Sequence, residues 1–243
     1  MMQARRRALL LLIGTVAAAA VLAFALARQG PKPPPERPPA QRPALLLLTS
    51  LPLVFGEQFS LEDAGSPALS ALRKRYRVVP ISVADPPELA KGRLLMMAQP
   101  LAQPAEDLVS LDSWVRGGGR LLLLADPMLE WPGKRPLGDP LRPPPMFMDT
   151  GLLAHWGLRL DSPDKRGPSV RELDGFAVLT LSPGRLSGAC AIDSHGLVAR
   201  CRLGKGRATV IADADLLNAP ALGPDASHNL DGVLAELARL EAQ

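Results

Sequence analysis

The sequence predicts an α/β domain with a doubly wound, mostly parallel sheet of the flavodoxin-like type. Uninterrupted apolar runs such as residues 121–125 are typical of strands buried on both faces of a parallel sheet. Residues 105–116, just before that run, carry apolar side chains at helical spacing, and Gly117 to Gly119 end the predicted helix. The first half of the chain gives the order strand, helix, strand, strand, helix, strand, which fits this class.

Charge is distributed unevenly along the 243 residues, of which 47% are hydrophobic. Seven of the 28 Lys and Arg side chains precede Pro43, where Glu36 is the one acid. The remainder, with the other 21 basic and 23 acidic side chains, has a net charge of −2. The overall charge of +4 therefore does not describe the globular part, and we expect no nucleic-acid partner.

The N-terminal segment 1–28 is predicted to be a transmembrane anchor. Arg5 to Arg7 precede an uncharged run, residues 8–27, that is long enough to cross a bilayer. The arginines favour a cytoplasmic N-terminus, which predicts a single-pass protein of the inner membrane with its domain in the periplasm. A signal peptide cleaved after Ala25-Leu26-Ala27 is the alternative.

Residues 29–43 are rich in proline and are expected to form an extended spacer, with a proline-rich recognition ligand as the alternative. Residues 44–243 then form the domain. The apolar runs expected in its main sheet are residues 44–50, 77–83, 93–98, 121–125 and 207–212. The further predicted helices are residues 66–76, 150–157 and 229–240.

Polar side chains follow the predicted parallel strands, where open α/β sheets bind their ligands. The residues expected to line this crevice are Ser50, Gln99, Asp126, Asp213, Asp215 and Asn218. The carboxylates could bind a cation or act as acid and base, or they could instead cap the turns that follow the strands. The proline- and glycine-rich residues 128–145 form a long loop over this edge, which we interpret as a lid or partner surface.

Residues 169–212 differ, because short apolar runs alternate with turn sequences, as in antiparallel hairpins. A hairpin around His195-Gly196 places Cys190 opposite Cys201 and predicts a disulfide between them. In a two-residue hairpin the two cysteines would form a hydrogen-bonded pair, a position where a cross-strand disulfide fits less well. Two buried free thiols or a metal pair are the alternatives, but no second Cys/His pair has ligand spacing, so no metal site is expected.

Three motifs together resemble a known family. They are Asp112 to Arg120 followed by a leucine run and Asp126-Pro127, Gly204 to Arg207 followed by a strand with Asp213, Asp215 and Asn218, and a closing helix introduced by Asn229. They resemble the extracytoplasmic domain of gliding-motility-type auxiliary proteins of ABC transporters, the ABC-type uncharacterized transport system domain. The resemblance implies a fold similar to class I glutamine amidotransferases without catalysis, and a permease or ATPase of an ABC transporter as partner.

The sequence departs from the amidotransferase enzymes at the end of strand 93–98. Gln99-Pro100 stands where those enzymes carry a cysteine nucleophile, and the three histidines, His155, His195 and His228, have no nucleophile to serve. We therefore expect no catalytic residue and no cofactor, and predict a membrane-anchored accessory or binding domain of an ABC transport system, whose small ligand is unknown. The alternative is a degenerate or metal-assisted hydrolase using Asp126, Asp213, Asp215 and His228, which requires those carboxylates to share a common point.

Overall fold

The computed structural model describes residues 30–54, 65–136, 138–193 and 195–243. The chain divides into two units, Met1–Lys32 and Pro33–Gln243, and the second is the domain described below. The anchor predicted over residues 1–28 lies outside the described residues. Within the described part of the chain, no helix has both the length and the apolar character needed to cross a membrane.

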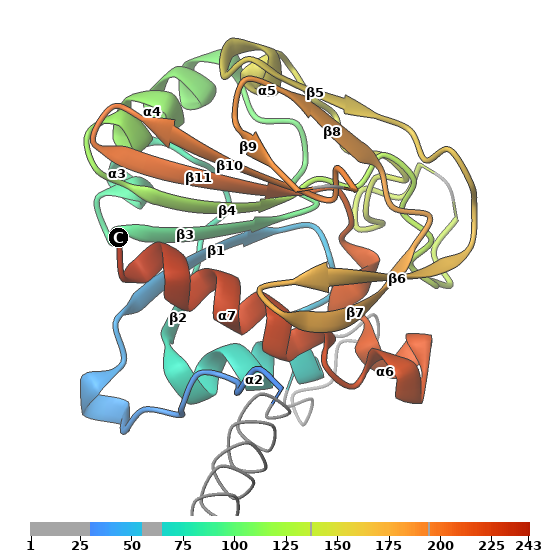
Figure 1. Cartoon of the computed structure of the whole chain (residues 1–243). Coiled ribbons are helices and arrows are strands. Elements are labelled where there is room, and N and C mark those ends of the chain that lie inside the picture. Colours follow the sequence, from blue (N-terminus) through green and yellow to red (C-terminus); the bar gives the residue numbers. More distant parts are fainter. Residues whose placement is uncertain (1–29, 55–64, 137, 194) are drawn as a thin grey trace, which may run out of the picture. The chain divides into compact units, whose positions relative to one another are not determined.

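A seven-stranded sheet forms the centre of the domain (Figure 1). Its strands, in spatial order, are β2 (Arg77–Pro80), β1 (Ala44–Thr49), β3 (Leu94–Ala98), β4 (Arg120–Leu124), β11 (Gly206–Ile211), β10 (Val198–Leu203) and β9 (Ala191–Ile192). The first five run parallel. Strand β10 is antiparallel to β11, and β9 is antiparallel to β10.

Helices cover both faces of this sheet, and the side chains of each strand alternate between them (Figure 1). On one face α2 (Pro67–Arg75) and α7 (Asn229–Glu241) pack with Leu122 and Leu124 of β4. On the other face α3 (Pro86–Leu89) and α4 (Ala105–Arg116) pack with Leu121 and Leu123. A leucine run is therefore apolar throughout because both of its faces are buried, each side chain contributing about 1.5–3 kcal/mol.

Two small antiparallel sheets complete the domain. They pair β5 (Leu158–Asp161) with β8 (Arg185–Gly188), and β6 (Pro168–Leu173) with β7 (Phe176–Leu181). The short helical turns are η1 (Pro39–Gln41), α5 (Leu152–His155), η2 (Asp215–Leu217), α6 (Ala219–Leu222) and η3 (Pro224–Ala226). The antiparallel hairpins expected over residues 169–212 are present, but they are divided, because β6 pairs with β7 whereas β9 and β10 extend the main sheet beyond β11.

Local contacts set the bounds of two short segments, one after β2 and one before β11. The strand expected over residues 77–83 stops at Pro80. The helix α3 then begins after Asp85, whose side chain accepts a hydrogen bond from the Glu88 N–H at 2.9 Å. At the start of β11, a Cβ on Gly206 would lie 1.8 Å from the Val115 carbonyl oxygen, so only glycine fits this close approach.

From Pro33 onward the proline-rich segment, expected to be an extended spacer over residues 29–43, belongs to the same unit as the domain and contacts it at Pro35 and Arg37. The Arg37 N–H donates to the Lys74 carbonyl at 3.0 Å, and the Arg75 guanidinium donates to the Pro35 carbonyl at 2.9 Å. The Arg37 side chain also pairs with Glu241 at the end of α7, at 2.8 Å. These contacts use the backbone and charged groups of the segment, which its proline content does not reveal.

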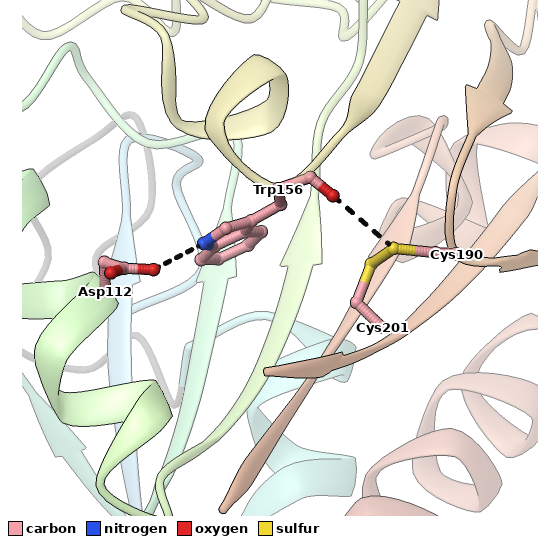
Figure 2. Close-up of a disulfide and its surroundings, with 4 residues drawn as sticks. All are labelled: Asp112, Trp156, Cys190 and Cys201. Carbon is pink, nitrogen blue, oxygen red and sulfur yellow. Dashed lines mark hydrogen bonds between the residues drawn. A yellow bond between two sulfur atoms is a disulfide. The ribbon is translucent and has the colours of Figure 1, made fainter. Parts of the chain in front are cut away.

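The predicted disulfide between Cys190 and Cys201 is confirmed, with a Cα–Cα distance of 4.8 Å (Figure 2). Its register continues that of β9 and β10, in which Ile192 pairs with Ala199. The Asp193 N–H donates to the Val198 carbonyl, so the cysteines occupy a non-hydrogen-bonded pair, where Cα atoms are closer. The loop between the strands is longer than the expected two-residue turn. The cysteines therefore do not occupy the hydrogen-bonded pair in which a cross-strand disulfide was expected to fit less well.

The disulfide lies against the short helix α5 (Figure 2). The Cys190 Sγ lies 3.9 Å from the Trp156 carbonyl oxygen. The Trp156 indole N–H in turn donates to the Asp112 carboxylate of α4 at 2.8 Å. The antiparallel edge of the sheet is therefore connected to α4 through one tryptophan.

Candidate functional site at the carboxyl edge of the sheet

Three predicted site residues, Asp126, Asp213 and Asp215, form a buried group that we call the carboxylate cluster. Asp126 follows β4, and the other two follow β11, the neighbouring parallel strand. Their exposed fractions are 0, 0 and 2%. The parallel register thus places them at the same edge, as the sequence predicts, but it places them inside the protein rather than along an open crevice.

Main-chain N–H groups occupy both oxygens of Asp126 and of Asp213. Asp126 accepts from the N–H groups of Met128 and Ala214, each at 2.8 Å. Asp213 accepts from Leu216 at 2.8 Å and from Leu181 of β7 at 2.9 Å. The two carboxylates therefore hold the strand ends and β7 together.

Asp215 connects the cluster to the loop of residues 128–145. Its carboxylate accepts from the Glu130 N–H at 2.8 Å. The Glu130 side chain accepts a hydrogen bond from the Ser182 hydroxyl. Glu130 could not be predicted from the sequence, because a proline- and glycine-rich loop without periodicity gives no signal that singles out one of its residues.

Burial disfavours the ionised forms of these acids. Burial raises the pKa of Asp126 to about 6 and that of Asp215 to about 7, although main-chain hydrogen bonds oppose both shifts. Burial, together with the charge of Asp126, raises the pKa of Asp213 well above its usual value. The cluster is thus held by hydrogen bonds at an electrostatic cost.

Gln99 is buried in the same edge and has a strained backbone, with φ of 43°. Its side-chain amide donates to the carbonyls of Asp126 and Pro144, each at 3.1 Å. Its side-chain oxygen accepts from the Asp126 N–H at 3.0 Å. Gln99 therefore joins β3 to β4 and fixes the far end of the 128–145 loop, with its amide fully occupied.

The other two predicted residues lie outside the carboxylate cluster. The Ser50 hydroxyl donates to the Gln99 carbonyl. Asn218 precedes α6, and its N–H donates to the Asp215 carbonyl at 2.8 Å. Both side chains are half-buried.

The arrangement does not support the metal-assisted hydrolase. In the residues that the structure describes, no group of three or more His, Cys, Asp or Glu side chains could hold a metal ion. His228 is exposed and pairs with Asp231 at 3.2 Å. The carboxylates approach one another, but their oxygens bind main-chain donors instead of facing a substrate.

An apolar cavity of about 350 Å³ adjoins this edge, beyond the ends of β1 and β2. We call it the apolar crevice. Its lining includes Ser50, Leu51, Leu101, Arg135 and Leu141. Leu101 and Leu141 are 53% and 69% exposed, and both line this one cavity, so they form part of a shared apolar surface. Ser50, one of the six predicted site residues, lines this crevice.

The loop over this edge is folded back on itself. The Leu129 N–H donates to the Pro145 carbonyl at 2.9 Å, and Trp131 packs against the core. The Arg142 side chain donates to the Arg135 carbonyl at 2.8 Å. Leu141 is therefore presented at the crevice by an ordered segment.

Of the comparisons with known proteins, the one with solved structures is the one that finds similar proteins. No family model matches the sequence, and no curated protein matches it. An exo-β-1,4-mannosidase from Opitutaceae bacterium strain TAV5 is similar with a TM-score of 0.50 and 15% identity, over 82% of this chain and 36% of the enzyme. A β-galactosidase from Rahnella sp. R3 gives a TM-score of 0.46 at 14% identity, over 84% of this chain and 32% of that one. A cytoplasmic protein from Salmonella typhimurium gives 0.46 at 11% identity, over 82% and 98%.

This chain spans about a third of the length of the glycosidases that it matches. At 15% identity the likeness to the mannosidase shows a shared fold alone. It corrects the predicted assignment to the flavodoxin-like and amidotransferase-like class, because the similar structures include glycosidases. Buried strands alternating with helices are common to many α/β folds, so that pattern cannot distinguish among them.

The described residues give no support to the predicted localisation, and the anchor segment 1–28 on which it depends lies outside them. A single-pass protein of the inner membrane with a periplasmic domain requires a spanning helix, and none is found among the described helices. The predicted description as an amidotransferase-like protein is corrected, because the similar fold is that of part of a mannosidase. The membrane and transport descriptors have no support in the described residues. Of those descriptors, the disulfide is the one that the structure supports.

Proposed function

We propose that this domain is a non-catalytic binding domain and that the apolar crevice is its binding surface. The observation that carries this proposal is the pair of half-exposed leucines, Leu101 and Leu141, at a cavity of about 350 Å³. Cavities of this size, lined by apolar side chains with a few polar groups, are typical of binding sites. The ligand that fits this lining is an apolar segment of a partner protein.

The carboxylate cluster supports the non-catalytic part of the proposal. A general acid or base must reach the proton that it transfers, and a metal site needs carboxylate oxygens that face the ion. Asp126 and Asp213 have exposed fractions of 0%, and each uses both oxygens for main-chain N–H groups. Their role is to hold the strand ends and β7 together, while Asp215 holds the loop beside the crevice.

The experiment places a photo-crosslinking amino acid at Leu141 and, as a matched control, at Val109, which is 67% exposed on α4. We expect crosslinked partner from the Leu141 position and none from the Val109 position, with the product identified by mass spectrometry. A permease or ATPase of an ABC transporter, the partner class that the sequence resemblance implies, is the first candidate to compare with that product. Equal yields from both positions would contradict a specific surface.

A second variant tests the apolar character of the surface. Leu101→Glu combined with Leu141→Glu should abolish capture at a crosslinker placed on Pro140 without shifting the urea unfolding midpoint, because both leucines are exposed. Undiminished capture by this variant would rule out the crevice.

A further inference from the structure

Three arginines lie side by side across the main sheet, at the end opposite the carboxylate cluster. Arg120 of β4 pairs in register with Arg207 of β11, and Arg207 pairs with Arg202 of β10. Residues paired at one register position project to the same face of a sheet. This face is the one covered by α7, because Thr209, two residues from Arg207, donates to Glu236 of α7 at 2.6 Å.

A cavity of about 430 Å³ opens beside this row, between β10, β11 and the last turn of α7. Its lining includes Arg200, Arg202, Arg207, Arg239, Thr209 and Gln243. Four guanidinium groups therefore border one cavity, and a helix and two strands hold their backbones.

The acids in this region are already bound to two of the four arginines. Arg200 pairs with the buried Glu236 at 2.8 Å and with Asp174 at 3.0 Å. Arg239 also pairs with Glu236, and it lies 3.4 Å from Asp174. These two carboxylates thus neutralise Arg200 and Arg239.

Among the described residues, the other two arginines of the cavity, Arg202 and Arg207, lack acceptors, and Arg120 beside them is only partly satisfied. Within the described part of the chain, no ion pair or hydrogen bond is formed by the side chains of Arg202 and Arg207. Arg120 donates to the Gly118 carbonyl, but its Nε is buried without a hydrogen-bond partner. Like charges directly opposite each other on neighbouring strands destabilise a sheet. An anion between them would reverse that effect.

We propose that this cavity binds a small molecule bearing an oligophosphate group. Guanidinium groups bind phosphate oxygens through two parallel hydrogen bonds, and several phosphates are needed to engage arginines from both strands. The cavity has the volume of a small-molecule site, and the near-neutral domain offers no extended basic surface for a nucleic acid. The proposal is independent of the apolar crevice, which lies at the other edge of the sheet.

The test is isothermal titration calorimetry of the full chain at 150 mM salt with tripolyphosphate, ATP and inorganic phosphate as probes. We expect one-to-one binding of tripolyphosphate or ATP, at least 10-fold tighter than that of phosphate. ATP binding more tightly than tripolyphosphate would assign the ligand to nucleotides, and the reverse order to inorganic oligophosphates. No binding of either oligophosphate would overturn the proposal.

The variant Arg202→Gln with Arg207→Gln should weaken oligophosphate binding at least 10-fold. The matched control is Lys165→Gln with Arg166→Gln, which removes two positive charges from a different cavity, of about 470 Å³. This control should bind as the wild type does. An equal loss in both variants would show non-specific attraction, and wild-type affinity in the arginine variant would place the anion elsewhere; either result overturns the proposal. Unchanged urea unfolding midpoints verify that both variants are folded.

Discussion

The two ends of β4 carry charged groups of opposite sign, and these groups differ in burial and in how many of their hydrogen bonds are already made. At its carboxyl end Asp126 and Asp213 are fully buried, and each carboxylate accepts two main-chain N–H bonds. At its amino end the arginine row is partly exposed, Arg202 and Arg207 lack acceptors among the described residues, and the Arg120 Nε has none there. Both ends gather like charges, but only the arginines have donors left to offer a ligand. The bonding already made by a charged cluster, rather than its charge, therefore distinguishes a structural group from a candidate binding site.

The strongest test of this comparison is Asp213→Ala. The change leaves the N–H groups of Leu181 and Leu216 buried without their acceptor, at about 1–3 kcal/mol each. We expect the free energy of unfolding, measured in urea, to fall by about 3 kcal/mol. The exposed Asp225→Ala is the control and should change it by less than about 0.5 kcal/mol. Equal effects of the two changes would refute the structural role of Asp213.

The next test concerns the covalent link at the arginine end, where Cys201 lies between Arg200 and Arg202. The disulfide closes a loop with a sequence separation of 11, and its loss should lower the free energy of unfolding by about 3 kcal/mol. Urea unfolding of Cys190→Ser with Cys201→Ser measures this. A reductant should destabilise the wild type equally and leave the double variant unchanged. Free thiols in the untreated protein would contradict the bond.

A pH series sharpens the carboxyl-end half of the comparison. The pKa of Asp215 is raised from 3.8 to about 7, so the folded state holds this proton more tightly than the unfolded state. Its contribution to stability is fully present below pH 3.8 and is lost as the pH rises to about 7. Asp215→Asn keeps an acceptor for Glu130 and should exceed the wild type in stability at pH 8 by on the order of 2 kcal/mol.

The expected advantage of Asp215→Asn over the wild type should shrink between pH 8 and pH 5, as urea unfolding at the two pH values will show. A constant difference would mean that Asp215 does not titrate in this window. The control Asp225→Asn should give the same small difference at both pH values.

The smallest expected effect is that of Arg202→Gln with Arg207→Gln in the absence of oligophosphate. Since these side chains oppose each other without acceptors, their removal should stabilise the domain by a few tenths of a kcal/mol, roughly the cost of a like-charge pair. Urea unfolding measures it. A loss above about 1 kcal/mol would show that the arginines hold the fold, and the contrast between the two ends of β4 would fail.

Local pattern was sufficient to place several elements. The helix predicted over residues 105–116 has those bounds in α4, and the register of Cys190 and Cys201 follows from the turn that joins their strands. The edge shared by Asp126 and Asp213 follows from parallel strands. Their burial does not, because it depends on how the loop of residues 128–145 folds over them.

The features that escaped prediction depend on contacts between distant residues. Glu130 joins the carboxylate cluster through Asp215 and Ser182, which are far from it in sequence. The arginine row requires the register of β4, β11 and β10 together, which no single segment encodes. The mostly parallel sheet with helices on both faces agrees with the prediction. The assignment to the flavodoxin-like and amidotransferase-like family was wrong for a related reason, since apolar periodicity identifies elements but not the family that arranges them.

The attachment of residues 35–37 has a mechanical consequence. A force that pulls on the chain before Pro35 meets the Arg37 contacts with Lys74 and Glu241 before it reaches β1. The load then divides between the last turn of α2 and the last turn of α7, two elements from opposite ends of the domain's sequence. Strand β1, hydrogen-bonded on both sides within the sheet, is thereby shielded from being peeled out from its first residue.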